Sequence, residues 1–381
     1  MANETLLWIQ IGCLVGGIIC ALLAYYYQTK FYEGFEDLKK AQKAEGPEKE
    51  RLVSRAIERT QKQMAARGLT NEGRAKLLNI LGLAYRFLAE IKDGPANLGL
   101  AIKAYRECAE LTDRAKLRSE YVDRRITLGE TCEEMAEKGE AEKYNELALA
   151  EYKEALAAAD SKETAEKRSQ LELKIAGCHI WLAGKRKDRY HASEAIRLLK
   201  AHLAAMDPQK NPIHFHLGHS MLANAYATAA DIDDRLENLH TALEHCGQAL
   251  AAREQMDRQF SDMTKDTIKV QGDAKISKMI EGIQASRTLS EFRILSLSSV
   301  LHMKLADLED RDRHLDMAMS AADEASKLRM LKEDPGYEKS MQKWRGTVER
   351  MRAGESFEQA SGKEKYGAEE AALEAATEAT A

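Results

Sequence analysis

The chain repeats itself every 47 residues, and this period constrains its fold more than any other feature. Leu81-Gly82 is followed three positions later by Tyr85. The same order of an aliphatic, a small and a larger residue recurs as Leu128-Gly129 with Cys132, Ile175-Ala176 with His179, and Leu222-Ala223 with Tyr226. A second pattern keeps this register: Ala101, Tyr105 and Cys108 recur as Ala148, Tyr152 and Ala155, then Ala195, Leu199 and His202, then Ala242, Cys246 and Ala249. Two patterns with one period across four units indicate a repeat architecture.

The spacing inside each pattern predicts that every unit is a helical hairpin. Steps of three and four residues place each set on one face of a helix. Ala, Glu, Lys, Leu and Arg dominate the chain, and all are strong helix formers. A single hairpin cannot bury its apolar face alone, so neighbouring hairpins are expected to stack. The predicted fold is therefore all-α.

A fifth, degenerate unit follows the four regular ones. Ala318, Ala322 and Ala325 match the second-helix pattern, and Ser299 stands in the place of the small first-helix residue. The step from Ala242 to Ala318 is 76 residues, which is 29 more than the period. The extra length falls around residues 253–285 and is predicted to extend a helix or to form an added one.

These motifs resemble the tetratricopeptide repeat (TPR) family, over about residues 70–330. That family pairs a Leu-Gly-x-x-Tyr first helix with an Ala-x-x-x-Phe/Tyr-x-x-Ala second helix, and ILGLAYRF with AIKAYRECAEL, and ALAEYKEAL in the second unit, fit it. The resemblance implies a right-handed α-solenoid. The usual unit has about 34 residues, so each helix here should be longer by a turn or two.

The resemblance also implies a concave face, made by the first helices, that binds peptides or helices of other proteins. Leu83 stands where the chaperone-binding subclass has an asparagine, so a C-terminal carboxylate is not the expected ligand. An acidic cluster in repeat two would favour a basic segment, whereas a merely solvated helix face is the alternative. In the family's register the face comprises Lys76, Asn79, Arg86, Asp123, Glu130, Glu133, Glu134, Gln170, Trp181, Ser220, Asn224 and Thr228.

An apolar run from Leu6 to Tyr27 predicts a transmembrane helix. It contains no charged residue, and about 20 apolar residues cross a bilayer core of about 30 Å. Trp8 and Tyr25 to Tyr27 lie near its ends, where aromatic rings favour the interface. A cleaved signal peptide is the alternative, but the leader carries no Lys or Arg. Lys30, Lys39, Lys40 and Lys43 follow the run and favour a cytoplasmic location for the rest of the chain.

Two glycines inside this run, Gly12 and Gly16, form a GxxxG pair that would let two such helices pack closely as a homodimer. The alternative is that glycine is simply common in membrane helices. The predicted organisation is an anchor over residues 1–29, a membrane-proximal hairpin over 30–69, the repeat domain over 70–352, and a disordered tail rich in Ala and Glu over 353–381.

Sequence motifs of catalysis and cofactor binding are weak. His214, His216 and His219 form the one tight histidine group, and packing near Pro212 explains it more simply than a metal site does. Gly218-His219-Ser220 lacks the second glycine of a nucleophile elbow. No phosphate-binding glycine loop occurs, and a net charge of −5 argues against a general nucleic-acid binder. The expected protein is not an enzyme and holds no cofactor or metal.

Together these features predict a single-pass membrane protein that recruits other proteins through its repeats, as an adaptor or assembly factor. The main alternative is a fixed structural subunit of a larger membrane or envelope complex. A third hypothesis, a metal-dependent enzyme, would need His214, His216 and His219 to share one ion.

Overall fold

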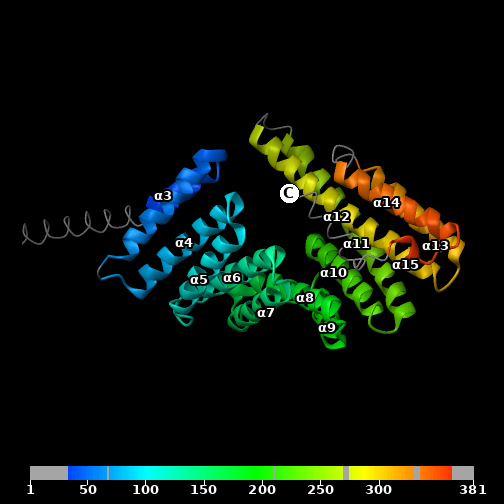
Figure 1. The fold of residues 1–381 in the computed structure, drawn as a ribbon, viewed down its shortest axis with the longest axis horizontal. Coiled ribbons are helices and arrows are strands. Elements are labelled where there is room, and N and C mark those ends of the chain that lie inside the picture. The colour runs from blue at the N-terminus through cyan, green and yellow to red at the C-terminus, as the bar shows by residue number, and fades with distance from the viewer. Residues whose placement is uncertain (1–32, 67, 209–210, 269–273, 329–334, 363–381) are drawn as a thin grey trace, which may run out of the picture. The chain divides into compact units, whose positions relative to one another are not determined.

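The computed structural model describes residues 33–66, 68–208, 211–268, 274–328 and 335–362, and the regular structure of these residues is entirely helical (Figure 1). The described residues form two compact units, which are divided between Leu171 and Glu172. An all-α fold of repeated hairpins was predicted, and the described residues confirm it.

The hairpins follow the predicted period. The first helices of the four regular repeats begin at residues 71, 118, 165 and 212, each 47 after the one before. The second helix of repeat five begins at residue 311, which is 76 residues after the second helix of repeat four begins at 235, and this is the longer step seen in the sequence. The helix pairs are α4 (Asn71–Ile91) with α5 (Gly94–Glu110), α6 (Arg118–Lys138) with α7 (Ala141–Ala158), α8 (Ala165–Arg186) with α9 (Arg189–Ala204), α10 (Pro212–Ala230) with α11 (Arg235–Ile268), and α12 (Ala274–Ala306) with α13 (Arg311–Ser326).

The turn inside each hairpin repeats one backbone conformation. One residue per turn is left-handed, and the φ angles are 49° at Asp93, 49° at Glu140, 53° at Lys187, 44° at Asp234 and 30° at Asp310. The first four of these positions are again 47 residues apart. A left-handed residue with a Cβ atom costs about 1–2 kcal/mol, so Glu140 and Lys187, which lack the local bonding of Asp, are strained.

We expect Glu140→Gly to stabilise the protein by roughly 0.5 kcal/mol, because relief of this strain exceeds the added chain entropy of glycine. Glu154→Gly, at an exposed position inside the same α7, should instead destabilise it by about 1 kcal/mol. Urea denaturation of both variants tests the pair. A loss of stability with Glu140→Gly would mean that the left-handed turn is not strained.

The two helices of each hairpin meet at the small residue of the first helix. A Cβ atom on Gly129 would lie 2.4 Å from Cε1 of Tyr152, and one on Gly82 would lie 2.7 Å from the Tyr105 ring. Both rings are buried. In repeat three alanine replaces the glycine and leucine replaces the tyrosine, so a larger first-helix residue meets a smaller partner. Repeats four and five have small residues on both helices at this position. The crossing pairs in order are Gly82 with Tyr105, Gly129 with Tyr152, Ala176 with Leu199, Ala223 with Cys246, and Ser299 with Ala322.

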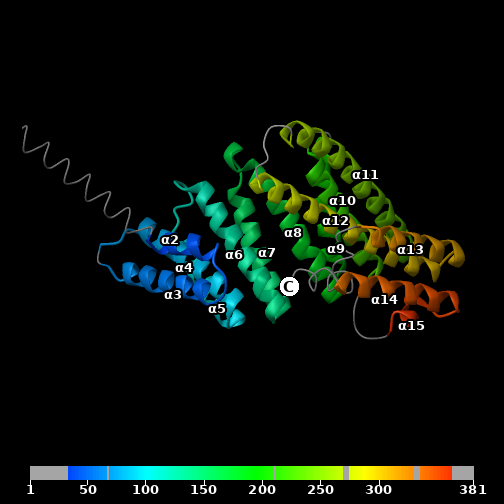
Figure 2. The same cartoon turned by 90° about the horizontal axis from the view of Figure 1, so that it is seen from above.

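The extra residues of the fifth step lengthen both helices that flank them. α11 has 34 residues and α12 has 33, whereas α10 has 19. The two long helices run side by side in Figures 1 and 2. Of the two predicted outcomes, extension is therefore the one that the structure shows.

The repeats are flanked by further helices. At the N-terminal side, α2 (Glu33–Ala41) and α3 (Gly46–Met64) form a hairpin around Leu38 and Val53. At the C-terminal side, α14 (Pro335–Arg352) is followed by α15 (Phe357–Ala360), which buries Ala360 against Val348 and Met351. The folded part continues to Gly362, beyond the boundary predicted at residue 353, because the backbone N–H of Phe357 donates to Asp307 at 2.8 Å.

In the part of the chain that the structure describes, no helix is both long and apolar enough to cross a membrane. The predicted span Leu6–Tyr27, with Gly12 and Gly16, lies outside the described residues. The anchor therefore stays a prediction.

Candidate protein-binding face

In the N-terminal unit, one repeat position faces solvent on every first helix. Lys76 on α4, Asp123 on α6 and Gln170 on α8 are equivalent by the period, and all three are exposed. Asn79 is exposed one turn after Lys76. Lys76 donates to Glu72 at 2.6 Å, an exposed pair of little energetic weight. These positions are open to solvent, and their role in binding a partner stays a prediction.

Ion pairs join neighbouring first helices on this face. Arg86 of α4 binds Glu134 of α6, with its Nε atom 3.1 Å from Oε2. Lys167 of α8 lies 2.7 Å from Asp123 and donates to the Ser119 hydroxyl at 2.7 Å. The first helices are therefore neighbours in the stack, and Glu134 is already neutralised from within the protein.

The two tyrosines at the hairpin crossings extend this network. The Tyr152 hydroxyl donates to Glu133 at 2.6 Å. Arg86, the repeat equivalent of Glu133, lies close to the Tyr105 hydroxyl. Burial raises the pKa of Tyr105 well above its ordinary value, although Arg86 opposes that shift. Two members of the predicted acidic cluster, Glu133 and Glu134, thus have structural partners, and Glu130 lies half-buried beside them.

The C-terminal unit contributes a different surface. Trp181 on α8, and Ser220 and Asn224 on α10, are half-buried. Thr228 is only 2% exposed, and its hydroxyl donates to the Asn224 carbonyl at 2.9 Å. The prediction that Thr228 belongs to a binding face is therefore wrong, because Thr228 satisfies its own helix.

Sequence reasoning missed two exposed apolar residues on α10. Ile213 is 62% exposed and Leu217 is 42% exposed, and they lie one helical turn apart. Leu217 is the repeat equivalent of Lys76, Asp123 and Gln170, so the period alone could have identified it. The equivalent position is thus exposed in all four regular repeats, with a different side chain in each.

The three clustered histidines separate in the structure. His216 contacts the Ala249 carbonyl at 2.8 Å and the Ser290 hydroxyl at 2.6 Å. His219 contacts His245, and the His214 ring lies 6.2 Å from that of His202. Among the described residues, no group of three or more His, Cys, Asp or Glu side chains is arranged to hold a metal ion.

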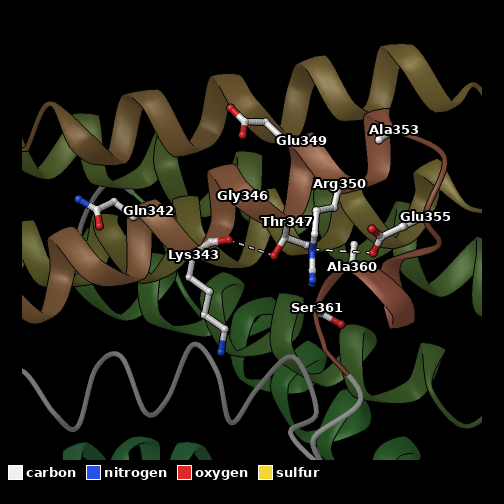
Figure 3. A pocket seen from close by; sticks show the side chains of 10 residues that line it. All are labelled: Gln342, Lys343, Gly346, Thr347, Glu349, Arg350, Ala353, Glu355, Ala360 and Ser361. Atoms are coloured by element: carbon white, nitrogen blue, oxygen red, sulfur yellow. Dashed lines mark hydrogen bonds and ion pairs between the residues drawn. The ribbon is translucent and has the colours of Figure 1, made fainter.

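A shallow cavity of about 540 Å³ lies beside α14 and α15 (Figure 3). Its lining groups bind one another: the Thr347 hydroxyl donates to the Lys343 carbonyl at 3.0 Å, and Arg350 lies 3.8 Å from Glu355. None of the residues that line it is a histidine or a cysteine. This cavity offers no nucleophile with an adjacent imidazole base.

No protein-family model matches the chain, and no curated protein is detectably similar to it.

Proposed function

We propose that this protein is a membrane-anchored, TPR-like adaptor or assembly factor that recruits other proteins through the exposed positions of its first helices. One observation carries the proposal. Lys76, Asp123, Gln170 and Leu217 occupy one repeat position and are all exposed, yet they differ in charge and polarity. Conserved packing with varied outward side chains is what a repeat array needs to recognise a partner.

The carboxylates of α6 favour a basic partner segment. Arg86 neutralises Glu134, but Glu130 and Glu133 add two further carboxylates to the same helix. A peptide or helix that brings lysine or arginine to α6 would complement them. Their half-burial strengthens each such contact relative to bulk water.

The predicted anchor would place this binding face at a membrane. A helix over Leu6–Tyr27 would hold the repeats at one membrane, where partners are concentrated and modest affinity suffices. Deleting residues 1–29 should move the protein from the membrane pellet to the supernatant after cell fractionation. Retention in the pellet would mean that another segment or a partner holds it there.

The first-helix face is tested by a charge exchange that leaves the fold intact. The double variant Lys76→Glu, Asp123→Lys reverses two exposed charges whose own ion pairs contribute at most about 1 kcal/mol each. A matched control, Lys103→Glu with Glu154→Lys, makes the same exchange at exposed positions of the second helices α5 and α7. Both are compared with wild type by affinity purification from membranes in mild detergent, quantified by mass spectrometry.

We expect the face variant to lose at least one partner by about tenfold, a change of about 1.4 kcal/mol, while the control retains it. Partners that return at fixed ratios with both variants would contradict recognition by this face. That result would favour the alternative function, a fixed structural subunit, whose contacts lie elsewhere.

A further inference from the structure

All ten histidines of the chain lie between His179 and His314, so the C-terminal unit contains every one and the N-terminal unit contains none. Six of them form three pairs, and each pair joins the two helices of one hairpin. This distribution is unexpected for residues that merely fill space, because the N-terminal hairpins have the same fold without them.

The first pair belongs to repeat three. Nδ1 of His179 on α8 lies 2.7 Å from Nδ1 of His191 on α9, and both rings are buried. Asp188, in the turn, places a carboxylate oxygen 3.7 Å from Nε2 of His191. Tyr190 meets both rings edge-on.

The second pair belongs to repeat five and is equivalent by position. Nδ1 of His302 on α12 lies 3.0 Å from Nδ1 of His314 on α13. Glu309 again supplies a carboxylate from the turn, 3.2 Å from Nε2 of His314. The same Glu309 binds Nε2 of His240 on α11 at 2.7 Å, and Arg313 adds a positive charge near His302.

The third pair, in repeat four, uses other positions. Nδ1 of His219 on α10 lies 3.0 Å from Nδ1 of His245 on α11, and Gln248 Oε1 lies 2.9 Å from the same His245 nitrogen. Because that amide oxygen only accepts, the His245 nitrogen carries the hydrogen, and Gln248 Oε1 and Nδ1 of His219 share it as acceptors. Glu244 and Lys200 are the charged groups near His245.

Each pair depends on a single shared hydrogen. One imidazole donates N–H and the other accepts with a lone pair, and the distances allow only one hydrogen between the two nitrogens. A first added proton can enter at the outer nitrogen of the donor ring. In repeat five this ring is His302, because the Glu309 carboxylate only accepts and Nε2 of His314 therefore already carries a hydrogen. A second proton must occupy the accepting nitrogen, where two N–H groups would then oppose each other.

We infer that the C-terminal unit is an acid-sensitive module, whose hairpins are fastened by histidine pairs that open when both rings become protonated, while the N-terminal unit does not respond. The inference needs no partner, so it stands independently of the proposed function.

Burial supports the direction of this response. It lowers the pKa of His219 to about 4, and it lowers the pKa of His302 to about 4, with the neighbouring histidine acting in the same direction. A histidine whose pKa falls on folding stabilises the fold above its unfolded pKa of about 6.5, and this contribution disappears as the pH falls toward 4. At pH 5 each such histidine weakens the folding equilibrium roughly 30-fold relative to pH 7.5.

Amide hydrogen exchange of the full-length protein in mild detergent with a metal chelator, followed by mass spectrometry, tests the inference directly. After correction for intrinsic exchange rates, protection of α9 to α13 should fall by at least about 30-fold between pH 7.5 and pH 5. Protection of α4 to α7 should stay unchanged. An equal loss in both units would assign the response to carboxylates and overturn the inference, as would unchanged protection of both.

The chain itself supplies the matched variants. Two other repeats have a tyrosine where the first histidine of the pair stands in repeats three and five, and an asparagine where the second stands. These residues are Tyr226 with Asn238 in repeat four, and Tyr85 with Asn97 in repeat one. Both asparagines donate to a turn carbonyl, at 2.7 Å for Asn238 and 2.9 Å for Asn97. The variant therefore combines His179→Tyr, His191→Asn, His302→Tyr and His314→Asn.

In this variant the acid response should vanish in repeats three and five and persist in repeat four, where His219 and His245 remain. A full response in repeats three and five would overturn the inference. If the variant does not fold at pH 7.5, exchange of the histidine C2 hydrogens in the wild-type protein measures the titration of each ring and tests the inference instead. At least one ring of each pair must then titrate well below pH 6, and ordinary titration of all six rings would overturn the inference.

Discussion

Replacing Gly129 with alanine is expected to destabilise the protein by about 3 kcal/mol, although alanine is the better helix former. The added methyl group would lie 2.4 Å from the buried ring of Tyr152, closer than any real contact allows. The ring cannot move away freely, because its hydroxyl is held by Glu133 at 2.6 Å. α6 and α7 must therefore separate or shift in register.

A compensating substitution shows whether this crossing causes the loss. The double variant Gly129→Ala, Tyr152→Leu installs the pair that repeat three uses, Ala176 with Leu199. We expect Tyr152→Leu alone to cost about 2–3 kcal/mol, and the double variant to cost at least 1 kcal/mol less than the sum of the two single variants. Urea denaturation followed by circular dichroism measures all three.

Gly99→Ala is the matched control for this experiment. Gly99 lies inside α5, and outside the backbone of its own helix no atom lies within 4 Å of the position of an added Cβ, so alanine should stabilise the protein by about 0.5–1 kcal/mol. A neutral result for Gly129→Ala would contradict the close crossing. Additive effects in the double variant would mean that glycine and tyrosine are not matched to each other.

The hairpins were predictable because their packing repeats in the sequence. Gly82 and Gly129 stand 47 residues apart, and so do the tyrosines that cover them. Such a pattern encodes both the helix faces and the partner of each face. The left-handed turns at Glu140 and Lys187 were not predictable, because neither residue type favours that conformation and the hairpin geometry imposes it.

The binding face was predicted less well, because a side chain on a helix can bind its neighbour instead of a ligand. Glu134 was assigned to an acidic groove, yet its partner Arg86 lies one repeat earlier, 48 residues back. Thr228 was assigned to the face by register, but its side chain is buried. The histidine pairs escaped notice because their members lie on different helices and no motif marks them.

An ion pair joins α10 and α12, and removing its acidic partner should destabilise the protein more than removing its basic partner. Lys304 of α12 is only 6% exposed, and its ammonium group lies 2.7 Å from Asp231 at the end of α10. Asp231→Ala leaves that ammonium buried without its carboxylate and should cost about 3 kcal/mol. Lys304→Met keeps a long, unbranched side chain and removes the buried charge, so it should change stability by less than about 1 kcal/mol.

The double variant Asp231→Ala, Lys304→Met should regain most of the stability that Asp231→Ala loses, because no buried charge remains. The Asp231 side chain is 29% exposed and also lies 3.8 Å from Lys187, so the cost of its removal belongs at the lower end of the range for buried pairs. Urea denaturation compares the three variants. Equal losses from both single variants would mean that the ion pair itself stabilises the junction of repeats four and five. The expected asymmetry would instead mean that apolar packing holds the junction, and that Asp231 is required because Lys304 is buried there.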